Sequence, residues 1–274
     1  KKESILCNIT FPDIPLDSFR FHKKHLRVAR SLKRKLDRHL NSIPLPQASL
    51  PTMPKILIIA SNHGDLAGKP NGTYLPELTH AVEVFAAEGI EYDLASPKGG
   101  KIPGYGEDAD DVTKKLLADA EFAARLESTK CLEDVDGSLY DAIFYPGGYG
   151  LLFDLSENAT AHKLVTAAYE SQKPIAAVCH GPAALAKIKL ADGETLLIAD
   201  KEVTGFTREE EVAMGTLEAI PYLLEERMME GGAIYRKKAA WKELVVVDGL
   251  LITGQNPQSA HGVGKALAAM LKKE

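Results

Sequence analysis

The feature that most constrains this chain is the alternation, from residue 55 onward, of short apolar runs with stretches of helical periodicity. The runs are four to six residues long, and several end in glycine, proline or other turn residues, which is typical of strands buried on both faces of a parallel sheet. Strands are predicted at 55–60, 92–95, 142–145 and 174–178. Helices are predicted at 76–89, 161–171 and 258–272.

This alternation predicts an α/β fold of the flavodoxin-like, doubly wound type: a mostly parallel sheet with helices on both faces. Two more short strands are expected within 195–204, and Asp248-Gly249 marks the turn of a hairpin over 244–253. In such folds the functional site lies at the carboxyl edge of the strands.

The first 53 residues differ from the rest and predict a separate extension, with the α/β domain at 54–274. Apolar residues recur at helical spacing over 21–40, and four prolines then mark a linker. Residues 1–54 carry 11 Lys and Arg against 4 acids, although the whole chain has a net charge of −5. An anionic partner or a transit peptide would suit this asymmetry, but we favour a solvated basic helix beside an acidic domain that predicts no nucleic-acid binding.

The cysteines and the apolar runs indicate the compartment. Cys7, Cys131 and Cys179 are far apart with no CxxC pair, which argues against a disulfide framework and for a reducing, cytoplasmic setting. The apolar runs are too short to cross a bilayer, so no membrane association is expected.

The strongest local signal is an apolar strand that stops at Cys179 and is followed by His180-Gly181-Pro182. Such a strand-to-helix elbow lifts one side chain above the sheet in a strained conformation. A helix starting at the proline would favour the thiolate of Cys179 through its partial positive charge. The alternative is a buried, inert cysteine, which suits Cys7 and Cys131 better.

A second glycine turn, Pro146-Gly147-Gly148-Tyr149-Gly150, follows the strand at 142–145. Parallel strands place such turns side by side, so Gly147 and Gly148 could offer backbone N–H groups to an oxyanion beside Cys179. A plain strand-to-helix turn explains this fragment equally well.

Taken together, ordered motifs from about Lys55 to the C-terminus resemble the ThiJ/PfpI superfamily, which shares its core with class I glutamine amidotransferases, and within it the heat-shock chaperone and glyoxalase III branch. The motifs are Asn71-Gly-Thr-Tyr-Leu-Pro-Glu77, Ser96-Pro-Lys-Gly-Gly100, Pro146-Gly-Gly-Tyr-Gly150, Val178-Cys-His-Gly-Pro182, Val203-Thr-Gly-Phe-Thr207 with Glu209-Glu-Glu211, and Thr253-Gly-Gln-Asn-Pro-Gln-Ser-Ala260.

The resemblance implies that Cys179 is the nucleophile and that Glu77 lies against its sulfur and exchanges a proton with it. It also implies that His180 and Glu211 complete a triad, with Glu210 as the rival for the acidic position. From the residues alone, Glu77 is equally a first-turn acid of a helix, and the run 209–211 is equally a solvated helix start.

The same resemblance assigns the oxyanion-hole amides to Gly148 and His180. Tyr149 departs from close relatives, which often have histidine there. Some bacterial members bind a metal through two histidines and a carboxylate, but the spacing of His63, Glu77 and His80 does not match, and His80 is expected on the exposed side of its helix. No metal and no cofactor are therefore expected.

The function implied is a glutathione-independent glyoxalase III that converts methylglyoxal, a small 2-oxoaldehyde, to D-lactate, with protein deglycase activity as a further option. Alternatives on the same fold are a cysteine peptidase or amidase, a redox sensor, and a stress-induced holding chaperone with unfolded protein clients. Relatives of this kind are commonly dimers, and a homodimer is expected.

Overall fold

The apolar run at the start of the domain forms β1 (Lys55–Ile59), the strand from which the sheet extends on both sides. The computed structural model describes residues 53–272, and in it residues 56–59 are 0% exposed. Residues 56 and 58 pack into one hydrophobic cluster and residues 57 and 59 into another. Because successive side chains of a strand point to opposite faces, β1 requires cover on both sides of the sheet.

The described part of the chain contains a seven-stranded sheet of order β12-β13-β9-β8-β1-β5-β7. The other six strands are β5 (Glu91–Ser96), β7 (Lys130–Cys131), β8 (Ala142–Tyr145), β9 (Ile175–Val178), β12 (Val245–Asp248) and β13 (Leu251–Gly254). All pairings are parallel except that of β12 with β13. The order β5-β1-β8-β9-β13 is the 2-1-3-4-5 order of flavodoxin-like folds, which confirms the predicted fold class.

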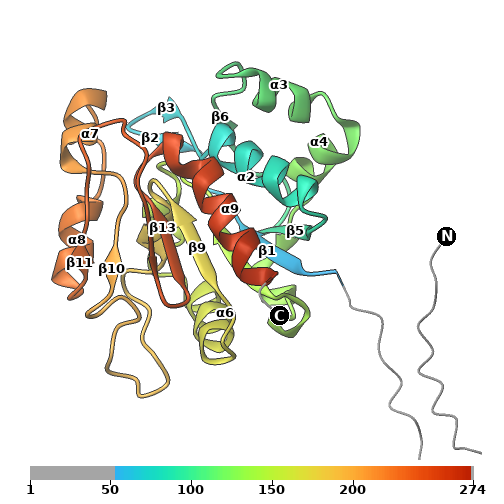
Figure 1. Cartoon of the computed structure of the whole chain (residues 1–274). Helices are drawn as coiled ribbons and strands as arrows, with labels where there is room; N and C mark the ends of the chain where they lie inside the picture. The colour runs from blue at the N-terminus through green and yellow to red at the C-terminus, as the bar shows by residue number, and fades with distance from the viewer. Residues whose placement is uncertain (1–52, 273–274) are drawn as a thin grey trace, which may run out of the picture. The chain divides into compact units, whose positions relative to one another are not determined.

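Helices cover both faces of this sheet, and two of them lie side by side across one face (Figure 1). α2 (Leu75–Ala87) and α9 (Ala260–Leu271) bury Leu78, Phe85 and Leu267 against the even-numbered residues of β1. On the other face, α6 (Ala159–Glu170) and α8 (Leu224–Glu230) bury Val165 and Met228. Each helix closes off apolar strand surface that water would otherwise meet.

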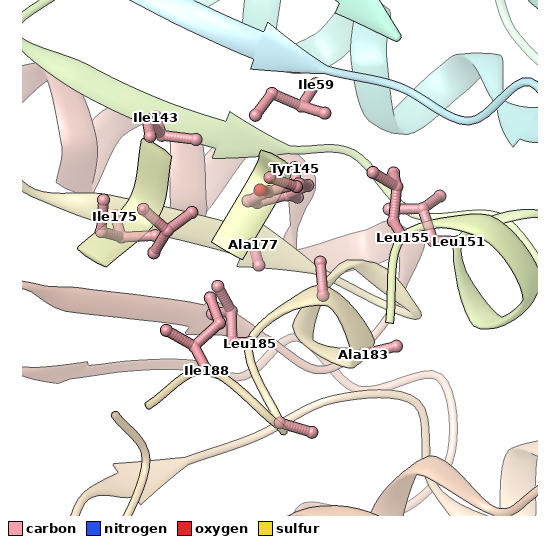
Figure 2. Packing of buried hydrophobic residues seen from close by; sticks show 14 of the residues in the cluster. Ile59, Ile143, Tyr145, Leu151, Leu155, Ile175, Ala177, Ala183, Leu185 and Ile188 are labelled. Carbon is pink, nitrogen blue, oxygen red and sulfur yellow. The ribbon is translucent and has the colours of Figure 1, made fainter. Parts of the chain in front are cut away.

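Figure 2 shows part of this second cluster, in which strand residues meet the segment after β9. The strands contribute Ile59, Ile143, Tyr145, Ile175 and Ala177, and the segment after β9 contributes Ala183, Leu185 and Ile188. This packing fixes the chain both before and after Cys179, so the core holds the elbow that carries this residue.

The remaining elements are short. The helices are α3 (Asp111–Leu117), α4 (Ala120–Glu127), α5 (Leu151–Asp154) and α7 (Arg208–Met214), with 3-10 turns η2 (Leu132–Asp134), η3 (Gly137–Leu139), η4 (Gly181–Ala184) and η5 (Pro257–Ser259). The short strands are β2 (Asp65–Leu66), β3 (Lys69–Pro70), β4 (Thr73–Tyr74), β6 (Gly104–Tyr105), β10 (Glu202–Val203) and β11 (Ile234–Tyr235).

The predicted strands and helices from residue 55 onward are confirmed to within two residues at each end, and so is the hairpin of β12 and β13. The prediction of two strands within 195–204 is wrong, because only β10 forms there. Leu197 and Ile198 are apolar because they lie in turns packed onto the core, rather than because they belong to a strand. The predicted basic helix and linker of residues 1–53 lie outside the described residues, apart from Met53.

None of the helices within residues 53–272 combines the length and the apolar character needed to cross a membrane.

Candidate active site

The carboxyl ends of β1, β8 and β9 meet at one edge of the sheet, and the elbow after β9 carries Cys179 there. Cys179 has φ +59°, in the left-handed region that non-glycine residues rarely adopt. Two backbone hydrogen bonds hold it: its N–H donates to the carbonyl of Gly254 at 2.9 Å, and its carbonyl accepts from Phe206 N–H at 2.9 Å. The strained elbow predicted from the sequence is present, with β13 and the β10–α7 loop supporting it.

The expected helix after the elbow is only the four-residue 3-10 turn η4. A single turn aligns too few peptide groups to act as the N-terminus of a helix toward the sulfur. The predicted stabilisation of the thiolate by a helix is therefore wrong. Instead, burial and the nearby carboxylate of Glu77 raise the pKa of the Cys179 thiol.

Glu77 enters the same site from the first turn of α2, although nothing in helix periodicity requires an acid to be buried there. Its side chain is 0% exposed, and neither carboxyl oxygen has a hydrogen-bond partner of normal geometry among the described residues. It lies against Gly147, where a Cβ would overlap Oε2 of Glu77 and approach within 2.6 Å of the Cβ of Cys179. Only glycine leaves space at this position for the acid and the thiol to be neighbours.

The protonation of this pair follows from its burial. Loss of solvent raises the pKa of Glu77 to about 8, although interactions with Cys179 and the backbone of Gly147 oppose the shift. The carboxyl is therefore mostly protonated at neutral pH, and the first proton to leave the pair leaves near pH 8. The remaining proton can lie on either the carboxyl or the sulfur.

His180 connects the sulfur to an acid on α7. Its Nδ1 lies 3.4 Å from Sγ of Cys179, and its Nε2 lies 2.7 Å from Oε1 of Glu211. His180 and Glu211 are each 1% exposed, so water does not screen their interaction. The histidine can point toward the adjacent cysteine because the elbow bends the backbone between them.

The second oxygen of Glu211 is held by two hydroxyl groups. Thr216 Oγ1 donates to Oε2, and the single hydroxyl proton of Tyr149 is shared between Oε2 at 3.3 Å and Oγ1 of Thr216 at 3.0 Å. Burial alone raises the pKa of Glu211, but these bonds and His180 outweigh it, so that the net pKa is lowered. Glu211 is therefore a stable carboxylate, oriented toward His180.

Glu210 and Glu211, the two candidates for the acidic position, have different partners. Oε2 of Glu210 accepts from the N–H and hydroxyl of Thr207 in a capping box, both at 2.9 Å. Its Oε1 accepts from the N–H of Trp241 at 2.9 Å and from the Asn256 amide at 2.8 Å. Glu210 thus faces away from His180. Of the two acids, Glu211 is the one that contacts the histidine.

The glycine turn after β8 lies where the sequence predicted it. Gly148 has φ +110°, and a side chain there would overlap the carbonyl of Gly72, so the turn approaches the β3–β4 loop closely. Within residues 53–272 the N–H groups of Gly148 and His180 donate no backbone hydrogen bond. Their use as oxyanion-hole donors, which the resemblance implied, stays a prediction, and so does that of Gly147.

A pocket of about 120 Å³ opens onto the sulfur and is mostly aromatic. The lining residues are Tyr74, Tyr105, Tyr149, Cys179, His180, Phe206, Met214, Trp241 and Pro257. The ring of His180 lies between those of Tyr149 and Phe206, with centroids 4.4 Å and 4.6 Å away. Sequence reasoning missed Tyr74, Tyr105, Thr216 and Trp241, because segments distant in the chain bring them together.

The two histidines considered as metal ligands make other contacts. His63 stacks on Phe153 with centroids 4.2 Å apart. His80 was expected on the exposed side of α2. It is partly buried instead, and its Nε2 lies 3.0 Å from Oδ2 of Asp110. Within the described residues no group of three or more His, Cys, Asp or Glu side chains is arranged to hold a metal ion.

Comparison with known proteins identifies the family. The family model described as DJ-1/PfpI family matches residues 70–270. The chain belongs to the DJ-1/PfpI family. The ThiJ/PfpI resemblance noted in the sequence is thereby confirmed, and every residue of the site described above falls inside the matched range.

Curated members of the DJ-1/PfpI family similar to this chain include two fungal glyoxalases. Glyoxalase 3 of Candida albicans is 31% identical over 226 residues, which cover 76% of this chain and 94% of that protein. The glutathione-independent glyoxalase HSP31 of Saccharomyces cerevisiae is 28% identical over 225 residues, covering 76% and 93%.

Solved structures show the same fold. The Rapid Encystment Protein 24 KDa of Francisella tularensis matches with a TM-score of 0.77 and 35% identity, covering 80% of this chain and 99% of that one. Glyoxalase III of Candida albicans matches with a TM-score of 0.73 and 29% identity, covering 79% and 97%.

Proposed function

We propose that this DJ-1/PfpI protein is a glutathione-independent glyoxalase III that converts methylglyoxal and water to D-lactate, with Cys179 as the nucleophile. The observation that carries the proposal is the pairing of Cys179 with two separate proton carriers, Glu77 on one side and His180 with Glu211 on the other. A reaction that moves one proton between adjacent carbons needs such groups near a nucleophile. The names of the fungal relatives point to the same activity.

In the first step the sulfur of Cys179 adds to the aldehyde carbon, forming a C–S bond and a hemithioacetal. The thiol proton passes to Glu77 in its ionised form. The aldehyde oxygen gains negative charge, which the N–H groups of Gly148 and His180 stabilise before the oxygen is protonated.

In the second step a base removes the proton from the former aldehyde carbon, and the oxygen of the neighbouring carbonyl takes up a proton, giving an enediol. The neighbouring carbon is then protonated as the hydroxyl group of the first carbon loses its proton and becomes the thioester carbonyl. No oxidant is needed, because one carbon is oxidised as the other is reduced. His180 suits this role because Glu211 holds its ring beside the sulfur, and Glu77 is the second acid–base group. The product is a 2-hydroxy thioester of Cys179.

In the last step water attacks the thioester carbonyl, the C–S bond breaks, and the 2-hydroxy acid leaves while the sulfur regains its proton. The same amides hold the second oxyanion. These steps use protein groups and water.

The aromatic pocket supports a small, neutral substrate. Its volume of about 120 Å³ matches a molecule of a few heavy atoms, and no Lys or Arg side chain lines it. A neutral 2-oxoaldehyde needs no cationic partner. An anionic 2-oxo acid would lie beside buried carboxyl groups with no cationic side chain to balance its charge, so its binding is disfavoured.

The decisive experiment measures D-lactate from methylglyoxal, without glutathione, for the full chain and for Cys179→Ala. We expect turnover in the parent protein and none in the variant. Cys131→Ala is the matched control, because Cys131 lies on β7 and its thiol donates to the carbonyl of Pro97, away from the site. Equal activity in Cys179→Ala, or none in the parent, would contradict the proposal.

The other roles stay predictions. A redox sensor needs an exposed thiolate, and Cys179 is 4% exposed with a raised pKa, so the site gives that role no support. No observation in residues 53–272 favours the remaining alternatives. These are hydrolysis of amides, protein deglycation, a holding-chaperone role with unfolded clients, a homodimer and a cytoplasmic location.

A further inference from the structure

One wall of the pocket comes from a segment that neither the nucleophile nor the triad explains. Residues 236–244 connect β11 to β12 and carry Trp241, which lines the pocket together with Met214 on α7. The indole packs edge-on against Phe206 with centroids 5.8 Å apart, and Phe206 in turn packs on the ring of His180. Trp241 is therefore one aromatic ring away from the reacting histidine.

The backbone holds Trp241 in this place at a cost. Its φ is +64°, in the left-handed region that strains a non-glycine residue. The indole is also 37% exposed, so burial of the side chain is incomplete. A strained residue beside a reactive group persists only where its surroundings determine its position.

Three buried polar side chains supply that determination. Glu210 accepts the N–H of Trp241 at 2.9 Å, and its same oxygen accepts the amides of Gln255 and Asn256 at 3.1 Å and 2.8 Å. Gln255 also accepts the N–H of Lys238 at 2.8 Å, and Asn256 donates to the carbonyl of Lys242 at 2.9 Å. Glu210, Gln255 and Asn256 are each 0% exposed.

We propose that Trp241 is the residue that limits the size of the substrate's substituent, and that Glu210 is a positioning residue that holds it at the pocket. In naming the substrate class as 2-oxoaldehydes with a small substituent, the inference rests on the proposed function. The adjacent acids of α7 then divide two tasks: Glu211 orients the histidine and Glu210 anchors the wall. This also gives a role to the Gln255-Asn256 motif.

The first test is independent of glyoxalase activity. In the full chain with Cys7→Ser and Cys131→Ser, Cys179 is alkylated with iodoacetamide and with the bulkier N-phenylmaleimide, and both rates are followed by intact mass. The rate ratio of the bulky to the small reagent is expected to rise roughly tenfold in Trp241→Ala, the scale of one wall group in an apolar pocket. It should rise less in Trp241→Phe, which keeps an aromatic ring.

The positioning role of Glu210 has its own matched control. Glu210→Gln should raise the same ratio without touching the indole itself, because the anchor is weakened. Glu209→Gln should leave it unchanged, because Glu209 lies on the same turn but is exposed and contacts only Lys237. An unchanged ratio in Glu210→Gln would overturn the positioning role of Glu210. An unchanged ratio in both Trp241→Ala and Trp241→Phe would overturn the proposal that Trp241 limits the size of the substituent.

A third readout needs no substitution at the wall. Trp241 is the single tryptophan of the chain, so its fluorescence reports on the pocket alone. Alkylating Cys179 with iodoacetamide should change the emission of Trp241, and no change would count against the assignment.

In the active enzyme, kcat/KM for phenylglyoxal relative to methylglyoxal should rise roughly tenfold in Trp241→Ala. Loss of turnover in the parent would contradict the proposed function, whereas an unmoved ratio would contradict only the wall.

Discussion

The carboxyl of Glu77 and the thiol of Cys179 lie next to each other beside Gly147, in a space that leaves no room for a methyl group. The acid comes from α2 after β1, and the thiol from the elbow after β9, more than one hundred residues later. Their proximity links the nucleophile to its proton acceptor in the proposed chemistry.

Gly147→Ala should abolish glyoxalase activity. The new Cβ would overlap Glu77 and lie 2.6 Å from the Cβ of Cys179, so the pair must separate, at a stability cost of roughly 1–3 kcal/mol. Gly193→Ala is the control: it adds a methyl group at positive φ where no atom lies within 4 Å. Turnover and urea unfolding of both variants check this, and normal turnover in Gly147→Ala would contradict it.

The rate should rise with pH as the Glu77–Cys179 pair loses its first proton. Because burial raises the pKa of Glu77 to about 8, kcat/KM should increase from pH 6 to pH 9 with a midpoint near 8. Glu77→Gln removes that proton acceptor, so its residual activity should be very low and lack this midpoint. A pH profile of both proteins that is the same in shape would show that Glu77 is not the titrating group.

Glu77 should also make the fold less stable as pH rises. Its pKa is about 8 when folded and near 4.5 when unfolded, so the stability gained from its neutral form is present below pH 4.5 and is lost as pH rises through 8. Between pH 5 and pH 7 the ionisation of this group should lower the free energy of unfolding by about 3 kcal/mol. Denaturant unfolding of Glu77→Gln should lack that part of the decline, and parallel curves for the two proteins would refute it.

Glu211→Gln should lower kcat roughly 100-fold, the scale of a lost acid–base partner, because a neutral amide replaces the carboxylate that pairs with Nε2 of His180. Tyr149→Phe should have a smaller effect, since Thr216 still donates to Oε2 of Glu211. Steady-state rates of the two variants, with exposed Glu209→Gln as control, test this order. A larger loss in Tyr149→Phe would reverse the assignment.

Two buried tyrosines should respond in opposite ways to loss of their hydroxyl groups. The hydroxyl of Tyr145 has no partner in the core shown in Figure 2, so Tyr145→Phe should leave stability unchanged or raise it by about 1 kcal/mol. The hydroxyl of Tyr140 donates to Asp93 at 2.8 Å, so Tyr140→Phe should cost about 1 kcal/mol. Thermal unfolding of both variants measures the difference, whose sign is the test.

The sequence by itself determined the sheet, its helices and the elbow, because each depends on a local pattern. An apolar run such as 55–60 has no stable place except between two layers, and a strand ending at Cys179-His-Gly-Pro has few conformations open to it. The resemblance to a known family added the roles of Glu77, His180 and Glu211, which no local pattern separates from ordinary helix residues.

Only the tertiary structure decided which of Glu210 and Glu211 contacts His180, because adjacent side chains on α7 point in different directions. The partners that distinguish the two acids, His180 for Glu211 and Trp241 and Asn256 for Glu210, lie 31 or more residues away in the chain. The same holds for Trp241, whose place at the pocket depends on Glu210, Gln255 and Asn256 from other segments. The electrostatics of Cys179 also reversed the local expectation: η4 is too short to favour the thiolate, whereas burial beside Glu77 raises the pKa of the thiol. Burial and long-range partners are properties of the folded chain, and no local pattern in the sequence encodes them.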